Sequence, residues 1–183
     1  MTTSAAARLL GTLLRRLART PPPPPATPVR KRVSRRRTPQ PRDTQRRKVY
    51  GWENEHVLPL DRRIMSIGAC ARLVEEAYRW AEADLAGKPG WHPPEVTDGR
   101  GRRHACGSRQ VIKLPRWART VPVVLHECAH GLADDRHGPR FVARYVDLLV
   151  RFMGLDRSML LATLARHRIR IAIADGLGTP PQR

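Results

Sequence analysis

The stretch His126–Phe141 reads HECAHGLADDRHGPRF, and it decides how the rest of the sequence is interpreted. It holds three of the chain's seven histidines, namely His126, His130 and His137. Side chains four residues apart on an α-helix point about 40° from each other and lie about 6 Å apart along its axis. If the stretch begins as a helix, His126 and His130 can therefore hold one metal ion between them.

Two other side chains of the same helical turn point elsewhere. Glu127 lies about 100° round the helix from His126, beside a bound ion rather than on it. That is where a base is needed to take a proton from a metal-activated water. Cys128, about 200° from His126, faces the core, so we do not expect it to be a ligand.

The third ligand has to come from beyond this helix. His137 is seven residues past His130, so a continuing helix would carry it about 10 Å further along the axis. A Zn–N bond of about 2.0 to 2.1 Å cannot be made from there. We expect the helix to break in DDRHGP and to turn His137 back, because Gly138 permits a left-handed turn and Pro139 suits the first turn of a new helix. Asp134, four residues past His130, is the rival ligand.

Apolar spacing around this stretch predicts several helices and one small sheet. Helical patterns run over residues 43–57, 66–87, 139–154 and from about 156 to 170, and the metal helix starts after Thr120 as a candidate N-cap. RQVIKL (109–114) is the most convincing strand, and DGRG (98–101) lies between two runs that could pair as a hairpin. We predict an α+β fold in which a small antiparallel sheet or hairpin packs on helices, with HECAH on a central helix.

The charge is unevenly distributed along the chain. Residues 1–42 hold eleven of the 35 Lys and Arg, no Asp or Glu, and the run PPPPP. Such a segment cannot bury enough apolar surface to offset its ordering entropy. We predict a disordered basic, Pro-rich arm over residues 1–41, one folded domain over 42–172 and a flexible tail over 173–183. The arm is a candidate for non-specific nucleic-acid binding by counterion release, with anionic lipid or a plain solvated linker as alternatives.

Three cysteines, at positions 70, 106 and 128, are widely spaced and form no CxxC pair. They predict neither a disulfide framework nor a four-cysteine zinc ribbon. No apolar run approaches the roughly 18 to 20 residues that span a bilayer. We therefore expect a soluble, cytoplasmic protein.

The quoted motifs also carry a family resemblance. HECAH followed by HGPRF is similar to the HExxH and HGPxF elements of SprT-like zinc metallopeptidases. The sequence more closely resembles a small family of uncharacterised HExxH metallohydrolases from actinobacteria and their phages, in which a helix of the RDTQRRKVY type (42–50) opens the domain and IKLPRWAR (112–119) leads into the metal helix. The likeness covers about residues 42–155. It implies a zincin-like domain with His126, His130 and His137 on zinc and Glu127 as the general base.

Two spacings depart from known peptidase patterns. The gap between HExxH and the third histidine is shorter than in SprT-like proteases. In the metzincin pattern HExxHxxGxxH the third histidine would come one place earlier, and Gly131 is not at the required position.

These features predict a zinc-dependent hydrolase, in the first place a peptidase. Three neutral imidazoles leave a position open for water on Zn²⁺, and Glu127 takes the proton of that water as it attacks a carbonyl and passes it to the leaving amine. A polypeptide could add as a strand to the exposed edge of RQVIKL. Tyr145 and His104 are candidates for stabilising the oxyanion. His167 has no ligand-spaced partner in the sequence.

Two alternatives from other classes stay open. One is a metal-dependent hydrolase of another bond, such as an RNA phosphodiester. The other is a catalytically idle, zinc-stabilised nucleic-acid-binding protein. Glu127 speaks against the second alternative, because a purely structural site more often closes its fourth position with Cys or His.

Overall fold

The computed structural model describes residues 43–172, so the predicted arm (1–41) and tail (173–183) lie outside the described residues. The described part contains five α-helices and a three-stranded sheet, which confirms the α+β prediction. In chain order the elements are α2 (Arg46–His56), the 3₁₀ helix η1 (Leu58–Leu60), α3 (Ile67–Ala81), β1 (Glu95–Asp98), β2 (Cys106–Gly107), β3 (Val111–Leu114), the 3₁₀ helix η2 (Arg116–Ala118), α4 (Val121–Leu132), α5 (Pro139–Met153) and α6 (Arg157–Arg166).

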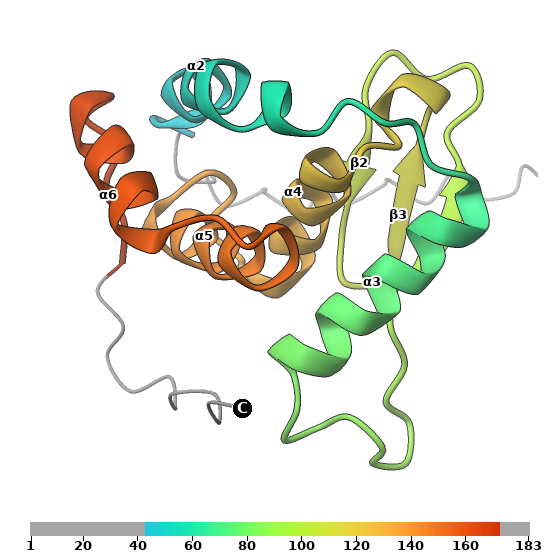
Figure 1. Cartoon of the computed structure of the whole chain (residues 1–183). Coiled ribbons are helices and arrows are strands. Elements are labelled where there is room, and N and C mark those ends of the chain that lie inside the picture. Colours follow the sequence, from blue (N-terminus) through green and yellow to red (C-terminus); the bar gives the residue numbers. More distant parts are fainter. Residues whose placement is uncertain (1–42, 173–183) are drawn as a thin grey trace, which may run out of the picture. The chain divides into compact units, whose positions relative to one another are not determined.

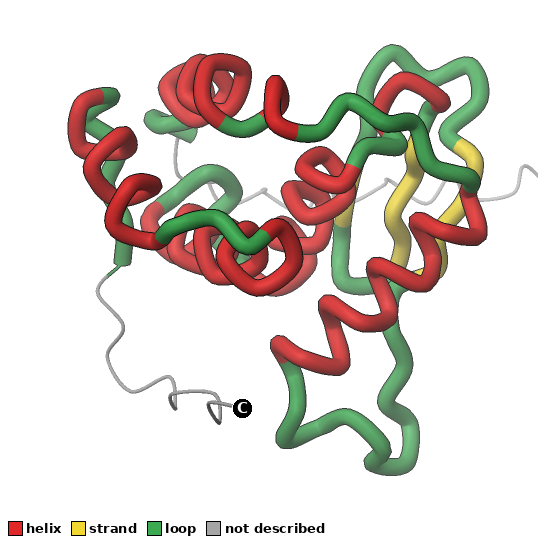
Figure 2. Tube along the Cα trace, viewed as in Figure 1, coloured by secondary structure: helices red, strands yellow, loops and turns green. Residues whose placement is uncertain are grey.

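The helix that carries HECAH, α4, is central, as predicted. It packs against α3, α5, β2 and β3, and Figures 1 and 2 show it between the sheet on one side and the pair α5 and α6 on the other. Its apolar face is buried through Val124, Leu125 and Cys128, each fully inaccessible to solvent. His126 and His130 are therefore carried by a helix that packs against four other elements.

The sheet differs from the predicted antiparallel hairpin. Its strand order is β1-β3-β2, with β1 parallel and β2 antiparallel to β3. DGRG therefore connects two strands that do not pair, and the true hairpin joins β2 to β3 through residues 108–110. The prediction of an exposed RQVIKL edge is wrong for the same reason. Since β3 has a partner on each side, it cannot accept a substrate strand.

Most helix termini follow the sequence signals. The Ser66 hydroxyl caps α3 by accepting a hydrogen bond from the backbone N–H of Ala69, and Gly154 ends α5 in the left-handed conformation with φ 65°. Thr120 is the N-cap residue of α4, although its side chain makes no capping hydrogen bond. Helix α3 ends at Ala81 rather than near Gly87, and α6 ends at Arg166.

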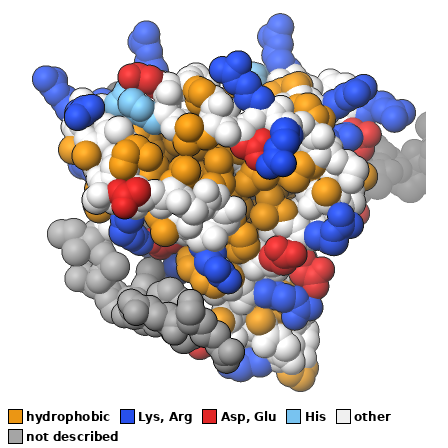
Figure 3. Space-filling model, viewed as in Figure 1, with side chains coloured by type: hydrophobic (Ala, Val, Ile, Leu, Met, Phe, Trp, Pro, Cys, Tyr) orange, Lys and Arg blue, Asp and Glu red, His pale blue; other side chains and the backbone are white. Residues whose placement is uncertain are grey.

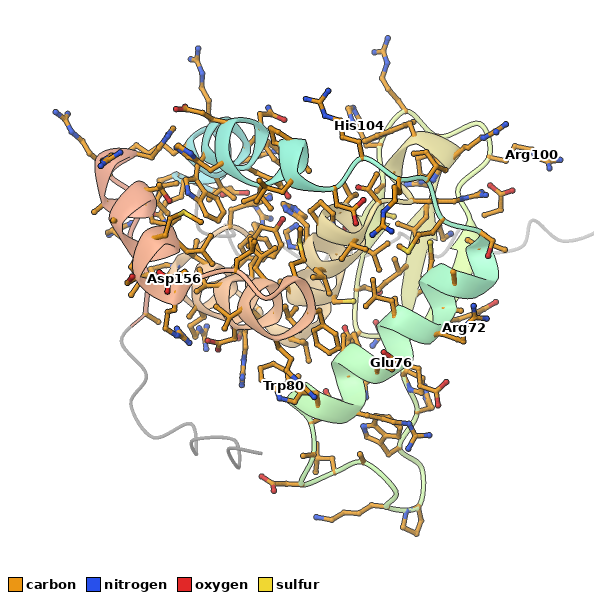
Figure 4. All side chains as sticks on the ribbon, viewed as in Figure 1. Arg72, Glu76, Trp80, Arg100, His104 and Asp156 are labelled. Carbon is orange, nitrogen blue, oxygen red and sulfur yellow. The ribbon has the colours of Figure 1, made fainter. Side chains whose placement is uncertain are left out.

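The helix faces divide into a packed side and a solvated side. Trp80 of α3 packs edge to face on Phe152 of α5, with ring centroids 6.1 Å apart. Arg72 and Glu76 lie exposed on the outer side of α3 (Figure 4). In Figure 3, Lys and Arg side chains surround a band of hydrophobic atoms on the visible face. None of the helices within residues 43–172 combines the length and apolar character needed to cross a membrane.

Candidate metal centre

Three imidazoles converge where α4 ends and α5 begins. His126 and His130 come from α4, and His137 comes from the loop before α5. One ring nitrogen of each lies within 4.8 Å of those of the other two. His126 and His137 are only 3% and 4% exposed. We call this group the buried centre; it could hold a metal ion, and the predicted three-histidine set is brought together.

The chain reverses at this point by a route that differs from the predicted one. Helix α4 stops at Leu132, and the left-handed residue of the loop is Arg136 (φ 59°), not Gly138 (φ −73°, ψ −176°). Gly138 is needed for another reason. A Cβ there would lie 2.3 Å from Oδ2 of Asp135, whose carboxylate accepts hydrogen bonds from two backbone N–H groups of the first turn of α5. Asp135 and Gly138 together fix where His137 points.

A buried carboxylate supports His126. Nδ1 of His126 lies 3.2 Å from Oε1 of Glu53 on α2, and the Tyr145 hydroxyl donates to the same oxygen at 2.6 Å. Glu53 is 5% exposed. A carboxylate that accepts the Nδ1 hydrogen fixes the ring's tautomer and leaves Nε2 with a lone pair for a metal. Sequence reasoning missed Glu53 because it lies 73 positions before His126.

A second carboxylate supports His137. Its Nδ1 lies 2.7 Å from Oδ2 of Asp43, and the side-chain amide of Gln45 donates to its backbone oxygen at 3.2 Å. Nε2 of His137 is buried, and it has no hydrogen-bond partner. A buried polar atom without a partner costs about 1–3 kcal/mol. A metal ion bound by the three imidazoles would satisfy this nitrogen, so the residues present fit such an ion.

Burial controls the protonation of these rings. It lowers the pKa of His130 to about 2, helped by the neighbouring His126 and His137. It also lowers the pKa of His137, against the hydrogen bond to Asp43. For His126, burial lowers the pKa, but the charge and hydrogen bond of Glu53 together with the charge of Glu127 outweigh it, so the pKa is raised. Two of the three rings thus favour the neutral form that ligates metals.

Glu127 lies beside the buried centre, on the predicted side. It is 6% exposed, and burial raises its pKa, with the nearby charge of His126 acting in the opposite direction. The backbone of β2 passes directly over it, because a Cβ on Gly107 would come within 2.1 Å of the backbone oxygen of Glu127. A buried carboxyl with a raised pKa is suited to accept and return a proton.

Tyr50 of α2 covers the outer side of the centre. Its ring stacks on His126 at 5.6 Å between centroids and meets the edge of His137 at 5.0 Å. It is 36% exposed and forms part of an open hollow of about 640 Å³. That hollow is lined by Asp43, Arg46, Arg47, Tyr50, Gly51 and Asn54. Because Tyr50 and Asp43 each contact a ligand histidine, the hollow adjoins the buried centre.

Other predicted candidates lie outside the centre. Asp134 is exposed and pairs with Arg140, and it does not belong to the buried group of three histidines. Cys128 is buried in the core, as expected. Tyr145 is engaged with Glu53 and fully buried, so it positions His126 and is not available to an oxyanion. His104, labelled in Figure 4, is exposed and does not belong to the group of three histidines.

His167 has no ligand-spaced partner in the sequence, but it has partners in the folded chain. His167 lies with Glu55 and His56, and one ligand atom of each is within 4.8 Å of the others. We call this group the surface cluster. Sequence spacing could not reveal it, because 111 positions separate the two histidines.

Comparison of the chain with protein-family models, with curated proteins and with solved structures found no match. The function of the protein is therefore inferred from the geometry of the site.

Proposed function

We propose that the protein is a zinc-dependent hydrolase, with peptide bonds as its first candidate substrate. One observation carries the proposal: three supported imidazoles converge, with a partnerless buried nitrogen on His137, beside the protonatable Glu127. Three histidines and one open position form a typical catalytic zinc set. When bound, zinc would act as a Lewis acid that makes water a stronger nucleophile.

The chain's own residues would then handle orientation and protons. His126, His130 and His137 would hold the ion by the ring nitrogens that face one another. Glu53 and Asp43 would keep two of these rings in the ligating tautomer. Glu127 would take a proton from water through its carboxylate and return it to the leaving amine. Burial raises the pKa of Glu127 above that of an ordinary carboxyl, and a raised pKa suits both halves of that cycle.

The substrate would approach through the hollow beside Tyr50, since both edges of β3 are paired. The Tyr50 ring faces two ligand imidazoles there, so its hydroxyl replaces Tyr145 and His104 as our candidate for hydrogen bonding to the reacting group. Tyr50→Phe should keep zinc binding and lower turnover. Loss of zinc in this variant would instead show that the ring's role is to pack on the ligands.

The positive lining of the hollow favours a second candidate function. Arg46 and Arg47 both line it, and the guanidinium of Arg46 lies 5.5 Å from the Tyr50 ring centroid. Two arginines beside a metal site suit an anionic group such as the phosphodiester of RNA. Glu127 would then take the proton from a water that attacks phosphorus instead of a carbonyl carbon, and the three histidines would hold the zinc as before. The buried centre is common to both functions, and the substrate distinguishes them.

A comparison of wild type with Glu127→Gln tests the proposal, because this change removes the proton acceptor and preserves shape. Each protein, zinc-loaded, is incubated with a cell extract, and new protein termini are identified by mass spectrometry. If the substrate is a peptide bond, we expect new protein termini that appear only with wild type. A parallel incubation with labelled RNA tests the second candidate. If neither protein nor RNA is cleaved in a Glu127-dependent way, the hydrolase proposal fails for both substrate classes.

A further inference from the structure

The surface cluster lies where α2 and α6 end. His56 is the last residue of α2, Glu55 precedes it, and His167 is the C-cap residue of α6. Figure 3 shows histidine side chains at the surface beside an acidic one over these two helices. The side chains of His56 and His167 are 22% and 24% exposed, so an ion from solvent can reach them without any opening of the core.

The spacing of the ligand atoms matches a metal's coordination shell. Nε2 of His56 and Nε2 of His167 are 3.2 Å apart. Oε1 of Glu55 is 3.4 Å from the first nitrogen, and Oε2 is 3.3 Å from the second. In a tetrahedron with metal–ligand bonds of about 2.05 Å, neighbouring ligand atoms are about 3.3 Å apart. The two imidazole nitrogens thus already have the separation that zinc would impose, and each of them lies at a similar distance from a different oxygen of the Glu55 carboxylate.

Packing one turn earlier in each helix holds this geometry. The indole nitrogen of Trp52 donates a hydrogen bond to the Thr163 hydroxyl at 2.9 Å, and both side chains are buried. Trp52 is four residues before His56, and Thr163 is four residues before His167. Residues four apart share a helix face. The buried hydrogen bond therefore sets the register that brings the two imidazoles together.

The electrostatics of the helix ends favour a cation at this place. The carboxyl end of an α-helix carries a partial negative charge. Two such ends contribute here, together with the carboxylate of Glu55. Zinc, nickel and copper bind well to imidazole, whereas magnesium and calcium prefer oxygen ligands. A set of two imidazoles and one carboxylate therefore favours an ion of the first group.

We propose that Glu55, His56 and His167 form a second metal site, separate from the buried centre, that takes a divalent cation of the zinc type. The bound ion would join α2 to the end of α6. The segment after His167 also contacts α2's N-terminal side, where the Gln45 side chain exchanges hydrogen bonds with the backbone of Arg170. A metal at the surface cluster would thus fasten the C-terminal end of α2 to the C-terminal part of the domain, to which Gln45 already joins the N-terminal end.

Calorimetric zinc titration of the metal-depleted full chain, without a histidine tag, tests this site. His56→Ala and His167→Ala should each bind one equivalent fewer than wild type. Glu55→Gln should weaken that equivalent by about 10-fold or more. His92→Ala is the matched control, because His92 is exposed on a loop, and it should bind as wild type does.

The difference in stoichiometry keeps this test independent of the proposed hydrolase. His126→Ala should leave the surface equivalent in place, and its far-ultraviolet circular dichroism reports whether the chain is folded. For His56→Ala and His167→Ala, the zinc equivalent that remains at the buried centre and an unchanged circular dichroism spectrum show that the chain is folded. If His56→Ala and His167→Ala bind as many equivalents as wild type, the contact between the rings is only a hydrogen bond and the second site does not exist.

Discussion

The buried centre and the surface cluster offer the same number of ligand side chains in different surroundings. In the buried centre, His126 and His137 are almost inaccessible, and each is held at Nδ1 by a carboxylate from another part of the chain. In the surface cluster, the rings are partly exposed and the one carboxylate is 63% exposed. Only the buried centre has a buried Glu beside the ligands.

This difference separates two kinds of metal chemistry. Burial makes each unsatisfied nitrogen costly and shifts the pKa of its neighbours, so we propose that the buried centre would gain from a metal and could tune a proton acceptor. The groups of the surface cluster can be hydrated at little cost, so we propose that a metal there would add stability and no chemistry.

Removing a ligand of the buried centre should have the largest effect. His126→Ala takes away one imidazole and leaves the buried Glu53 with the Tyr145 hydroxyl but without the His126 ring. We expect zinc affinity at this centre to fall by more than about 100-fold, beyond the range for changes behind a ligand. Competition with a chromophoric chelator measures it. A variant that binds within about 10-fold of wild type would remove His126 from the ligand set.

Removing a supporting carboxylate should have an intermediate effect. Glu53→Gln keeps the size of the side chain and loses the charge that fixes His126. Zinc affinity should fall by about 10- to 100-fold. Tyr145→Phe, which removes only the hydroxyl that donates to Glu53, should have a smaller effect. Equal affinities for Glu53→Gln and wild type would show that the carboxylate does not support the ligand.

The metal-free protein should lose stability in acid. Burial lowers the pKa of His130 to about 2 from an ordinary value of 6.5, so between these values the unfolded chain binds a proton that the folded chain does not. The contribution of His130 to the free energy of unfolding is fully present above about pH 6.5. It falls as the pH drops, by up to about 2 kcal/mol at pH 5.

Urea unfolding at pH 7 and pH 5 measures this loss. The raised pKa of His126 changes stability with pH in the opposite direction. The contribution of His130 is therefore obtained by comparing the pH dependence of wild type with that of His130→Gln. The variant should show the flatter dependence on pH. Identical slopes for the two proteins would mean that His130 is not held neutral by the fold.

The smallest effect should come from the surface cluster without metal. His167→Ala removes one partly exposed ring and its contact with the Glu55 carboxylate. We expect the free energy of unfolding to change by less than about 1 kcal/mol in the absence of zinc. With excess zinc, wild type should gain stability that the variant lacks. A large loss in the metal-free state would mean that the cluster is a structural contact.

The sequence predicted the parts of the site that depend on local spacing. The four-residue separation of His126 and His130, the side of Glu127 and the return of His137 after the helix break all follow from helix geometry and Gly-Pro chemistry. The detail of the break did not follow, because Arg136 adopts the left-handed conformation and Gly138 is selected by its contact with Asp135.

The remaining features depend on pairings between distant segments. The predicted hairpin was wrong because β1 pairs with β3, although β2 lies between them in the sequence. Such short strands carry no sequence signal for this pairing. Glu53 left one trace in the sequence, since it falls between Trp52 and the buried Val57 in an apolar helical stripe. A charged residue in such a stripe indicates a buried partner, but not which one. The meeting of His56 with His167 left no trace.

Zinc content of the full chain, purified without a tag and dialysed against metal-free buffer, tests the central claim most directly. After this dialysis we expect about one tightly held zinc, at the buried centre, in wild type, in Glu127→Gln and in Asp134→Ala, whose exposed carboxylate pairs with Arg140. His137→Ala should lose it, because the partnerless Nε2 at the centre is removed. Wild type without near-stoichiometric zinc, or His137→Ala that retains it while Asp134→Ala does not, would contradict the account.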